Sequence, residues 1–473
     1  MSDTDLCFMP ATELAARIAR RDVSSVEVTT EVLAHIAALE PTLNAFATAT
    51  PELALEMAAA ADKKLAKGDS LGVLHGVPTT IKDLVDVGGL PTERGSYIHK
   101  GNIAQNDTAF VSRLRTAGAV FLGKTTTSEF GWKGVSHSPL TGVTSNPWRV
   151  GFNAGASSAG AGAGAAAGFG PLHHGSDGAG SIRMPAHFCG VFGLKPTFGR
   201  IPNVPVRNND QVSHTGPLTR TVADAALMLG VMAGPEPLDH YSLESPPADY
   251  AGELGNGIKG KRVAYSADLG HAKVDENIAA IVADAVRAFD DLGVQVESSS
   301  PAFGPDGPEI VRYFWAAHEL ELAKYLPEFG TRMDPGLVAC IEDARNSSAV
   351  EYVTMRSRKL AYIEAIHRYF EEWDFLLTPA VSVAAFPAER LQPAHWPQHD
   401  WDWLSWAEFS YPFNMSGNPS AIVPAGFTED GLPVGLQITG KRFDDLGVLQ
   451  AAAAFEKARP WAQHRPALAN SST

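Results

Sequence analysis

Residues 154–170 form a tract of glycine, alanine and serine that is interrupted by a single large side chain, Phe169. Such a tract is either a flexible linker between two autonomous blocks or a helix buried so tightly that only small side chains fit. A linker should lead into polar sequence, whereas residues 171–196 are mixed and apolar. We therefore predict a buried helix whose backbone packs closely against neighbouring backbones.

Helical and strand-like segments alternate over the rest of the chain. In residues 262–297, two short apolar runs flank a segment whose apolar residues repeat at helical spacing, which predicts a β-α-β unit. We further expect helices over 10–66 and 349–372, and strands at 77–81, 119–122 and 375–377. This alternation predicts an α/β fold with helices on both faces of a sheet.

The composition limits the classes of function. The 473 residues, 45% of them hydrophobic, supply a core for one large unit or for about two to three average domains. A net charge of −15 repels phosphate backbones and anionic lipids, so we expect neither a nucleic-acid partner nor a membrane.

The sequence also bears on where the protein works. No apolar run reaches the ~20 residues of a membrane helix, and residues 1–10 lack the basic segment of a signal peptide. Cys7, Cys189 and Cys340 are odd in number and far apart, which indicates reduced thiols in a cytoplasmic protein.

Several motifs match a known chemistry in letters but not in context. Residues 118–125 fit the phosphate-loop pattern GxxxxGK[ST], yet their inner residues are strand-like, so we interpret the match as a coincidence. The pair His318-Glu319 lacks the second histidine of a zinc helix, and His395 and His399 lie in a proline-containing stretch. We expect no metal and no cofactor.

A serine that follows small residues is a candidate nucleophile. Ser181 comes directly after Gly178, Ala179 and Gly180, where small side chains allow backbone N–H groups to face one point. Such a nest can hold an oxyanion, and a serine beside it needs a base. Gly/Ser-rich turns are common, so the motif alone does not establish catalysis.

Lys82 is the candidate base, at the end of the apolar run 77–81. A lysine acts as a base only when it is neutral, and burial lowers its pKa because desolvation disfavours the charged form. A surface lysine after a strand remains the alternative on these residues alone.

The chain resembles the amidase-signature family over residues 11–458. The likeness is carried, in order, by GVPTTIKDLVDV, GAVFLGKTTTSEF, the small-residue tract, GSDGAGSIRMPAHFCGVFGLKPTFGR, GPLTRTVADAA and PFNMSGNPSAIVPAGFTEDGLPVGLQI. It implies a single α/β/α sandwich around a mixed, twisted sheet. It also implies one domain over 1–473, with N-terminal helices at 1–66, a signature core at 76–225, a variable substrate-cleft region at 300–410 and a further core part at 411–458.

The resemblance also implies roles for individual residues. Ser181 matches the nucleophile, Ser157 the proton-relaying serine and Lys82 the base. The Ala156–Ser157 peptide bond is expected to be cis, and the N–H groups of Gly178, Ala179, Gly180 and Ser181 match the oxyanion hole. Supporting residues would be Ser158, Asp177 and Arg183, the last two bracing the loop.

The sequence differs from the family pattern at two places next to these residues. The usual Gly-Gly-Ser-Ser-Gly-Gly reads Gly-Ala-Ser-Ser-Ala-Gly at 155–160, and the usual Thr-Gly-Gly-Ser reads Gly-Ala-Gly-Ser at 178–181. All three reactive side chains remain, so we expect activity.

The substrate is less constrained by the sequence. By the resemblance, Gly131, Trp132 and Ser157 fall where family members line the substrate cleft. An indole at that position favours apolar or aryl amides as substrates. Esters and carbamates (urethanes) are further candidates. Trp132 in the core is the alternative. The tryptophans of 385–408 surround a core strand or form an aromatic loop over a pocket.

Two other functions remain to be weighed. The glutaminase component of a tRNA-dependent amidotransferase resembles the same family throughout and would work in a complex. A non-catalytic binding protein fits less well, because Lys82, Ser157 and Ser181 are all present. The expected partner is a small amide or carbamate, and the expected assembly is a monomer or a homodimer.

Overall fold

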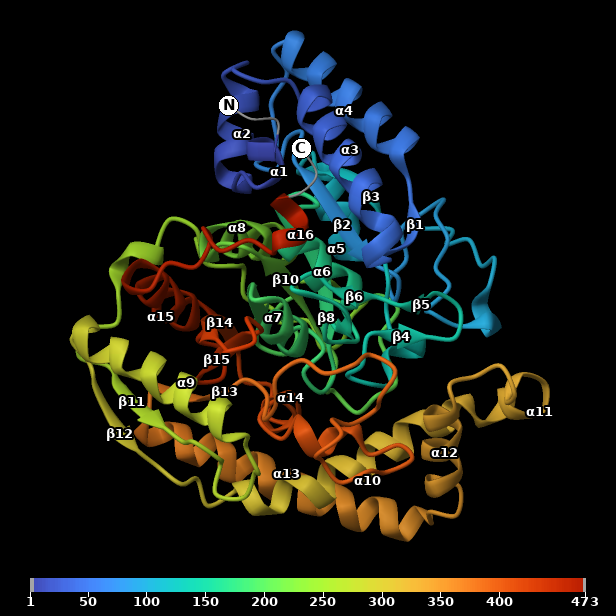
Figure 1. The fold of residues 1–473 in the computed structure, drawn as a ribbon, viewed down its shortest axis with the longest axis vertical. Helices are drawn as coiled ribbons and strands as arrows, with labels where there is room; N and C mark the ends of the chain where they lie inside the picture. The colour runs from blue at the N-terminus through green and yellow to red at the C-terminus, as the bar shows by residue number, and fades with distance from the viewer. Residues whose placement is uncertain (1–3, 471–473) are drawn as a thin grey trace.

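The computed structural model describes residues 4–470, and its centre is an eleven-stranded mixed sheet (Figure 1). In sheet order the strands are β1 (Phe46–Ala49), β3 (Val120–Thr125), β2 (Pro78–Lys82), β8 (Leu172–Asp177), β10 (His214–Thr219), β9 (Phe192–Lys195), β14 (Ser420–Phe427), β15 (Pro433–Gly440), β13 (Phe375–Pro379), β11 (Arg262–Tyr265) and β12 (Gln295–Ser298). One continuous sheet joins the strands of residues 46–219 to those of residues 262–440 through the pairing of β9 with β14, and we propose on this ground that the chain is a single domain. Residues 1–3 and 471–473, which that prediction includes, lie outside the described residues.

Helices cover both faces of the sheet, so the predicted α/β sandwich is confirmed. The helices α6 (Ala159–Ala167) and α7 (Arg183–Cys189) pack together on one face, and α8 (Val222–Met232), α9 (Glu276–Val286) and α15 (Asp445–Ala458) pack on the other. Seven other helices lie elsewhere in the described residues: α1 (Thr4–Cys7), α2 (Ala11–Ala19), α3 (Ser25–Leu43), α4 (Pro51–Ala66), α5 (Ala109–Thr116), α14 (Tyr411–Met415) and α16 (Ala467–Asn470).

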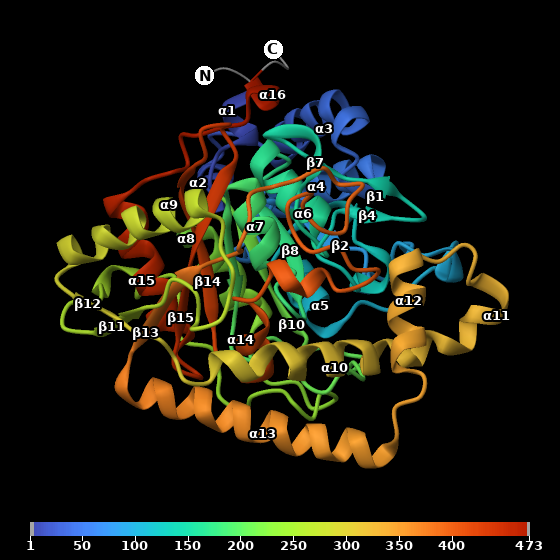
Figure 2. The ribbon, with the colours of Figure 1, turned by 60° about the horizontal axis from the view of Figure 1, so that its bottom comes forward.

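Three further helices lie along one end of the molecule, where α10 (Gly307–Glu319) runs beside the long α13 (Ala349–Glu372) and contacts α12 (Pro335–Ala344) (Figure 2). The short α11 (Leu326–Phe329) projects next to α12 in the same view. Two small hairpins complete the structure, β4 (His137–Ser138) with β5 (Gly142–Val143), and β6 (Ser145–Asn146) with β7 (Arg149–Asn153).

The predicted elements are confirmed, but six strands of the central sheet were not predicted, namely β1, β8, β9, β10, β14 and β15. The predicted β-α-β unit is β11, α9 and β12, with β11 and β12 parallel, and the predicted helix at 349–372 is α13. The phosphate-loop match falls on β3, which confirms that it is a strand rather than a phosphate loop. The segment 10–66 is helical except for β1, which pairs with β3 at the edge of the sheet and has too few residues to show a period.

Within residues 4–470, none of the helices combines the length and the apolar character that crossing a bilayer requires.

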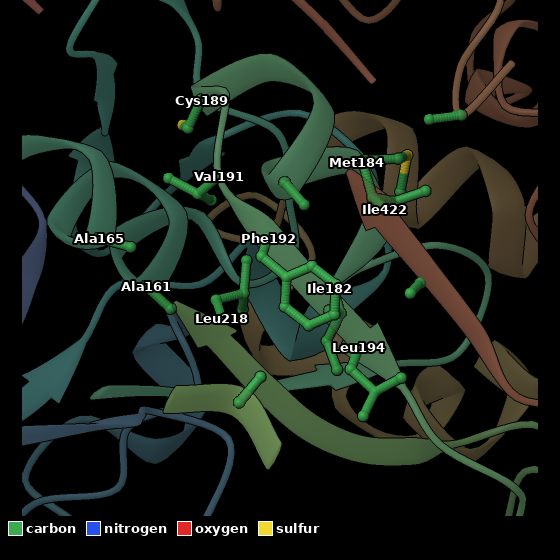
Figure 3. Packing of buried hydrophobic residues seen from close by; sticks show 14 of the residues in the cluster. Ala161, Ala165, Ile182, Met184, Cys189, Val191, Phe192, Leu194, Leu218 and Ile422 are labelled. Carbon is green, nitrogen blue, oxygen red and sulfur yellow. The ribbon is translucent and has the colours of Figure 1, made fainter. Parts of the chain in front are cut away.

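The small-residue tract forms α6, and every residue of this helix is buried. In Figure 3, Ala161 and Ala165 project from α6 toward the core that contains Phe192 and Leu218. A Cβ atom on Gly160 would lie 1.9 Å from the backbone oxygen of Ala45 and 2.7 Å from the backbone nitrogen of Thr126. The missing side chains therefore allow α6 to lie against neighbouring backbone, as predicted.

Replacing Gly160 by alanine tests this close approach. Because the new methyl group meets backbone that cannot rotate away, we expect Gly160→Ala to lower the free energy of unfolding by about 2–3 kcal/mol or more. The matched control is Gly230→Ala in α8, where a Cβ has open space and alanine stabilises a helix by up to ~1 kcal/mol relative to glycine. Urea unfolding measures both, and a Gly160→Ala protein as stable as the control contradicts the packing described.

Candidate active site

Two adjacent cavities that share part of their lining lie beside α10. The inner cavity has a volume of about 70 Å³ and includes Ser157 and Ser181 in its wall. The outer cavity, of about 440 Å³, shares part of that wall, including Leu84, Phe130 and Glu319. The structure thus brings four of the predicted site residues, Gly131, Ser157, Gly178 and Ser181, to one cavity.

Lys82 ends β2 and is fully buried beneath this cavity. Its Nζ atom lies 2.7 Å from Ser157 Oγ, 3.0 Å from Ser158 Oγ and 3.1 Å from Ser176 Oγ. Among residues 4–470, no carboxylate lies within ion-pair distance of the amine. The amine is thus surrounded by hydroxyl groups rather than by a counter-ion.

The hydroxyl groups around Lys82 give its lone pair a direction. Ser158 Oγ donates to the backbone oxygen of Ser176 at 3.1 Å, so toward Lys82 it acts as an acceptor. A neutral amine that donates to Ser158 and to Ser176 has its lone pair left for the remaining neighbour, Ser157 Oγ. The arrangement therefore suits proton transfer from Ser157 to Lys82.

Burial lowers the pKa of Lys82 well below its ordinary value of 10.5. The positive charge of Arg207 lowers it further, while the carboxylate of Asp177 opposes the shift. The direction of the shift favours the neutral amine that a base requires.

The turn from β8 into α7 is held by a buried ion pair between Asp177 and Arg183. The Arg183 Nε and Nη2 atoms each donate to the carboxylate at 2.9 Å, and Asn414 Nδ2 donates to it at 2.8 Å. Burial alone would raise the pKa of Asp177, but the charge of Arg183 and these hydrogen bonds hold it below its ordinary value. Arg183 also donates to the backbone oxygen of Ser410 and to Gln437, which ties the turn to distant parts of the chain.

The same carboxylate changes the predicted oxyanion nest. The N–H of Gly180 donates to Asp177 Oδ1 at 2.6 Å and is therefore not free to face the cavity, which corrects the prediction for this residue. Within the described part of the chain, the N–H groups of Gly178, Ala179 and Ser181 have no hydrogen-bond acceptor. Three of the four predicted donors thus remain available.

The serines reach the cavity from two segments. The Ala156–Ser157 peptide bond is cis, as the resemblance implies, and Ser157 precedes α6. Ser181 follows the nest, and the backbone N–H of Ser158 donates to its carbonyl oxygen at 3.2 Å. No hydrogen bond between Ser157 Oγ and Ser181 Oγ is present in residues 4–470, although both side chains line the inner cavity.

Gly131 and Trp132 have different positions relative to the cavity. Gly131 lines it, and a Cβ there would lie 3.0 Å from Ser157 Oγ, so the missing side chain leaves room beside the serine. The indole of Trp132 is buried in the core against Gly336, outside both cavities. The prediction that this side chain lines the cleft is therefore not met, because the chain turns between the two residues.

The tryptophans of 385–408 also lie outside both cavities. Trp403 and Trp406 are fully buried in a loop with one turn of 3-10 helix, and Trp403 Nε1 donates to the backbone oxygen of Trp132. The segment is therefore a buried aromatic loop, and the alternative of a loop over the pocket is not met. His395 contacts Asp275, and residues 4–470 contain no cluster of three or more side chains suited to hold a metal.

Sequence reasoning missed much of the cavity wall. Trp315, His318 and Glu319 line the inner cavity from α10, and Arg207 lines it from the loop before β10. The spacing i, i+3, i+4 on α10 places the first three on one helical face, which is a visible signal. Nothing in the sequence shows that this face points at Ser181, because α10 lies more than 100 residues further along the chain.

Comparisons with known proteins agree with this geometry. A family model described as Amidase matches residues 27–449. The chain is 40% identical to an acylamidase of Rhodococcus erythropolis over 99% of both chains, and 33% identical to a glutamyl-tRNA(Gln) amidotransferase subunit of Geobacter over 95% of this chain and 97% of the relative. The crystal structure of a bacterial aryl acylamidase of the amidase-signature enzymes matches with a TM-score of 0.90 and 28% identity, over 96% of this chain and 97% of that one.

Replacing Lys82 by methionine tests whether burial keeps the amine neutral. Because the pKa of Lys82 is lowered in the folded protein, the unfolded chain binds one more proton between that lowered pKa and about 10.4. As the pH rises across this window, the free energy of unfolding of the unmodified protein should increase relative to Lys82→Met by up to about 1.4 kcal/mol per pH unit. Urea unfolding at several pH values measures the difference, and a difference that is constant with pH contradicts a lowered pKa.

Proposed function

The chain belongs to the amidase family, and we propose that it hydrolyses carbon–nitrogen amide bonds through an acyl-enzyme on Ser181. The observation that carries this proposal is the fully buried Lys82, whose amine lies 2.7 Å from Ser157 Oγ and has no carboxylate partner in the described residues. A buried amine among hydroxyl groups supplies a base without a histidine or a metal.

In the proposed cycle, Ser181 Oγ attacks the amide carbonyl carbon and its proton moves to Ser157 Oγ. The proton of Ser157 moves at the same time to the neutral Nζ of Lys82, which becomes an ammonium. When the tetrahedral intermediate collapses, the same relay returns a proton to the leaving nitrogen, and the carbon–nitrogen bond breaks. Water then attacks the acyl-enzyme with the same relay as its base and releases the acid.

In this proposal, the turn after β8 stabilises the negative charge that develops on the carbonyl oxygen. The N–H groups of Gly178, Ala179 and Ser181 are the proposed donors, and removing a single donor from an oxyanion hole typically costs about 2.7–4 kcal/mol of barrier. Asp177 and Arg183 hold these donors in place and do not contact the substrate in this proposal. Ser158 acts beside them by accepting a hydrogen bond from Lys82.

The proposed substrates are apolar or aryl amides, with esters and carbamates as further substrates. Leu84, Phe130, Val212 and Trp315 supply an apolar part of the wall of the inner cavity. The similarity to an acylamidase and to an aryl acylamidase supports the same class. The glutaminase alternative has less support, because identity to the amidotransferase relative is 33% against 40% for the acylamidase.

We also propose a cellular compartment and an oligomeric state for the enzyme. Cys7, Cys189 and Cys340 are unpaired and buried, which supports a reducing compartment such as the cytoplasm. A monomer or a homodimer remains our proposal for the assembly.

Release of p-nitroaniline from short-chain and aromatic acyl p-nitroanilides tests the nucleophile. We expect Ser181→Ala to lower kcat by about 10⁴-fold or more, because no other group in the proposal forms the acyl-enzyme. The matched control is Ser420→Ala, a buried serine in β14 that bonds to Thr439 away from the cavity, and it should keep its activity. Activity that persists in Ser181→Ala means that another residue is the nucleophile.

The pH profile of kcat/KM tests the base. Because the proposed base is neutral Lys82 and burial lowers its pKa, kcat/KM should fall about tenfold per pH unit only below that lowered pKa and be level above it. A lysine in water would instead give a rate that still rises as the pH approaches 10.5. Such a rise in this enzyme would contradict the assignment of Lys82.

A further inference from the structure

The helix α10 turns one polar and aromatic face toward the cavities. Trp315, His318 and Glu319 lie at i, i+3 and i+4 on this helix and all line the inner cavity. Figure 2 shows α10 crossing the end of the molecule in front of β10 and α14. The proposed reaction uses none of these three side chains.

Glu319 stands out because its carboxyl group has no partner. It lines both cavities, yet no hydrogen bond or ion pair of this carboxyl occurs in the described residues. Burial raises the pKa of Glu319 to about 8, and the nearby carboxylates of Glu129 and Glu321 raise it in the same direction. In a closed core, burying a carboxyl group without a hydrogen-bond partner would destabilise the fold. Glu319 instead lines a cavity that a ligand can fill.

Charged and titratable side chains from several elements surround Glu319. Glu129 belongs to the turn Glu129–Gly131, Cys340 to α12, and Glu321 and Lys324 to the 3-10 segment Leu320–Tyr325 that follows α10. The other charged or titratable groups that share its cavities are Asp86, Arg94, His99, Arg207, His318 and Tyr325. None of the cations among them is within ion-pair distance of Glu319 in residues 4–470.

We propose that Glu319 determines specificity by binding a primary ammonium group that the amide substrate carries away from its scissile bond. This inference rests on the proposed function, since it names a substrate class for the same site. An ammonium supplies the positive charge and the hydrogen-bond donors that Glu319 lacks, and the acidic neighbours Glu129 and Glu321 favour a cation at this position. Once ionised, the same carboxyl groups would repel an anionic substituent.

The proposal has a pH dependence of defined sign. Glu319 must ionise to pair with an ammonium, and its raised pKa means that much of the free enzyme is protonated there below a pH of about 8. The preference for an ammonium should therefore increase with pH, by up to about tenfold per unit, and become level above pH 8. It holds until the substrate amine itself loses its proton, at about pH 10.

The test compares two matched series of p-nitroanilides. One series has ω-aminoacyl groups of increasing chain length, and the other has n-alkanoyl groups in which a methyl replaces the ammonium. The ratio of the two kcat/KM values at each pH cancels the titration of Lys82, which both reactions share. We expect the ratio to be largest at one chain length and to rise with pH up to about 8.

Two variants separate pairing with Glu319 from the general charge of the cleft. Glu319→Gln should lower the ratio by at least about tenfold at pH 8 and remove its pH dependence, while still cleaving the n-alkanoyl series as a folded enzyme. Glu321→Gln removes the same charge two residues further along, at the outer cavity, and should keep the rise with pH.

A flat ratio in the unmodified enzyme, or a ratio unchanged by Glu319→Gln, overturns the inference. If the n-alkanoyl series is cleaved in a Ser181-dependent way in that case, the proposed function stands and only the ammonium site fails. If neither series is cleaved, the proposed function fails, and the inference fails with it.

Discussion

The buried ion pair between Asp177 and Arg183 is the interaction on which the arrangement of the site depends. One carboxylate accepts hydrogen bonds from the backbone of the turn and from Arg183, and the guanidinium reaches Ser410 and Gln437 on separate segments. Neither charge is exposed to water, so removing one partner would leave the other uncompensated. The pair thereby fixes the turn that carries Ser181 and determines which N–H groups point outward.

Close backbone packing brings the second half of the site into place. Helix α6 lacks large side chains and lies against the backbone of Ala45 and Thr126 beside β2 and β3. Ser157 and Ser158, which precede this helix, therefore come within hydrogen-bond distance of Lys82 at the end of β2. The same close packing excludes water from the amine, so the geometry and the lowered pKa of Lys82 share one cause.

Two ionisable groups at the cavities lack counter-ions, with opposite consequences. Lys82 lies below the inner cavity and is shifted toward its neutral amine, and Glu319 lies on the wall and is shifted toward its neutral acid. The first is enclosed by serine hydroxyl groups and suits proton transfer, whereas the second faces open space and suits recognition. Both depend on burial and on the absence, within residues 4–470, of an opposite charge at ion-pair distance.

The sequence by itself determined the buried small-residue helix, the β-α-β unit and the long helix α13, and through its family motifs it pointed to Lys82, Ser157 and Ser181 as the candidate catalytic residues. These features are local or motif-bound, so a pattern in one segment carries them. It could not show that Asp177 accepts a hydrogen bond from the N–H of Gly180, that Trp132 lies in the core, or that Glu319 lines the same cavity as Ser181. Those outcomes depend on contacts between segments far apart in the chain, and only the tertiary structure decides which group a side chain meets and whether water reaches it.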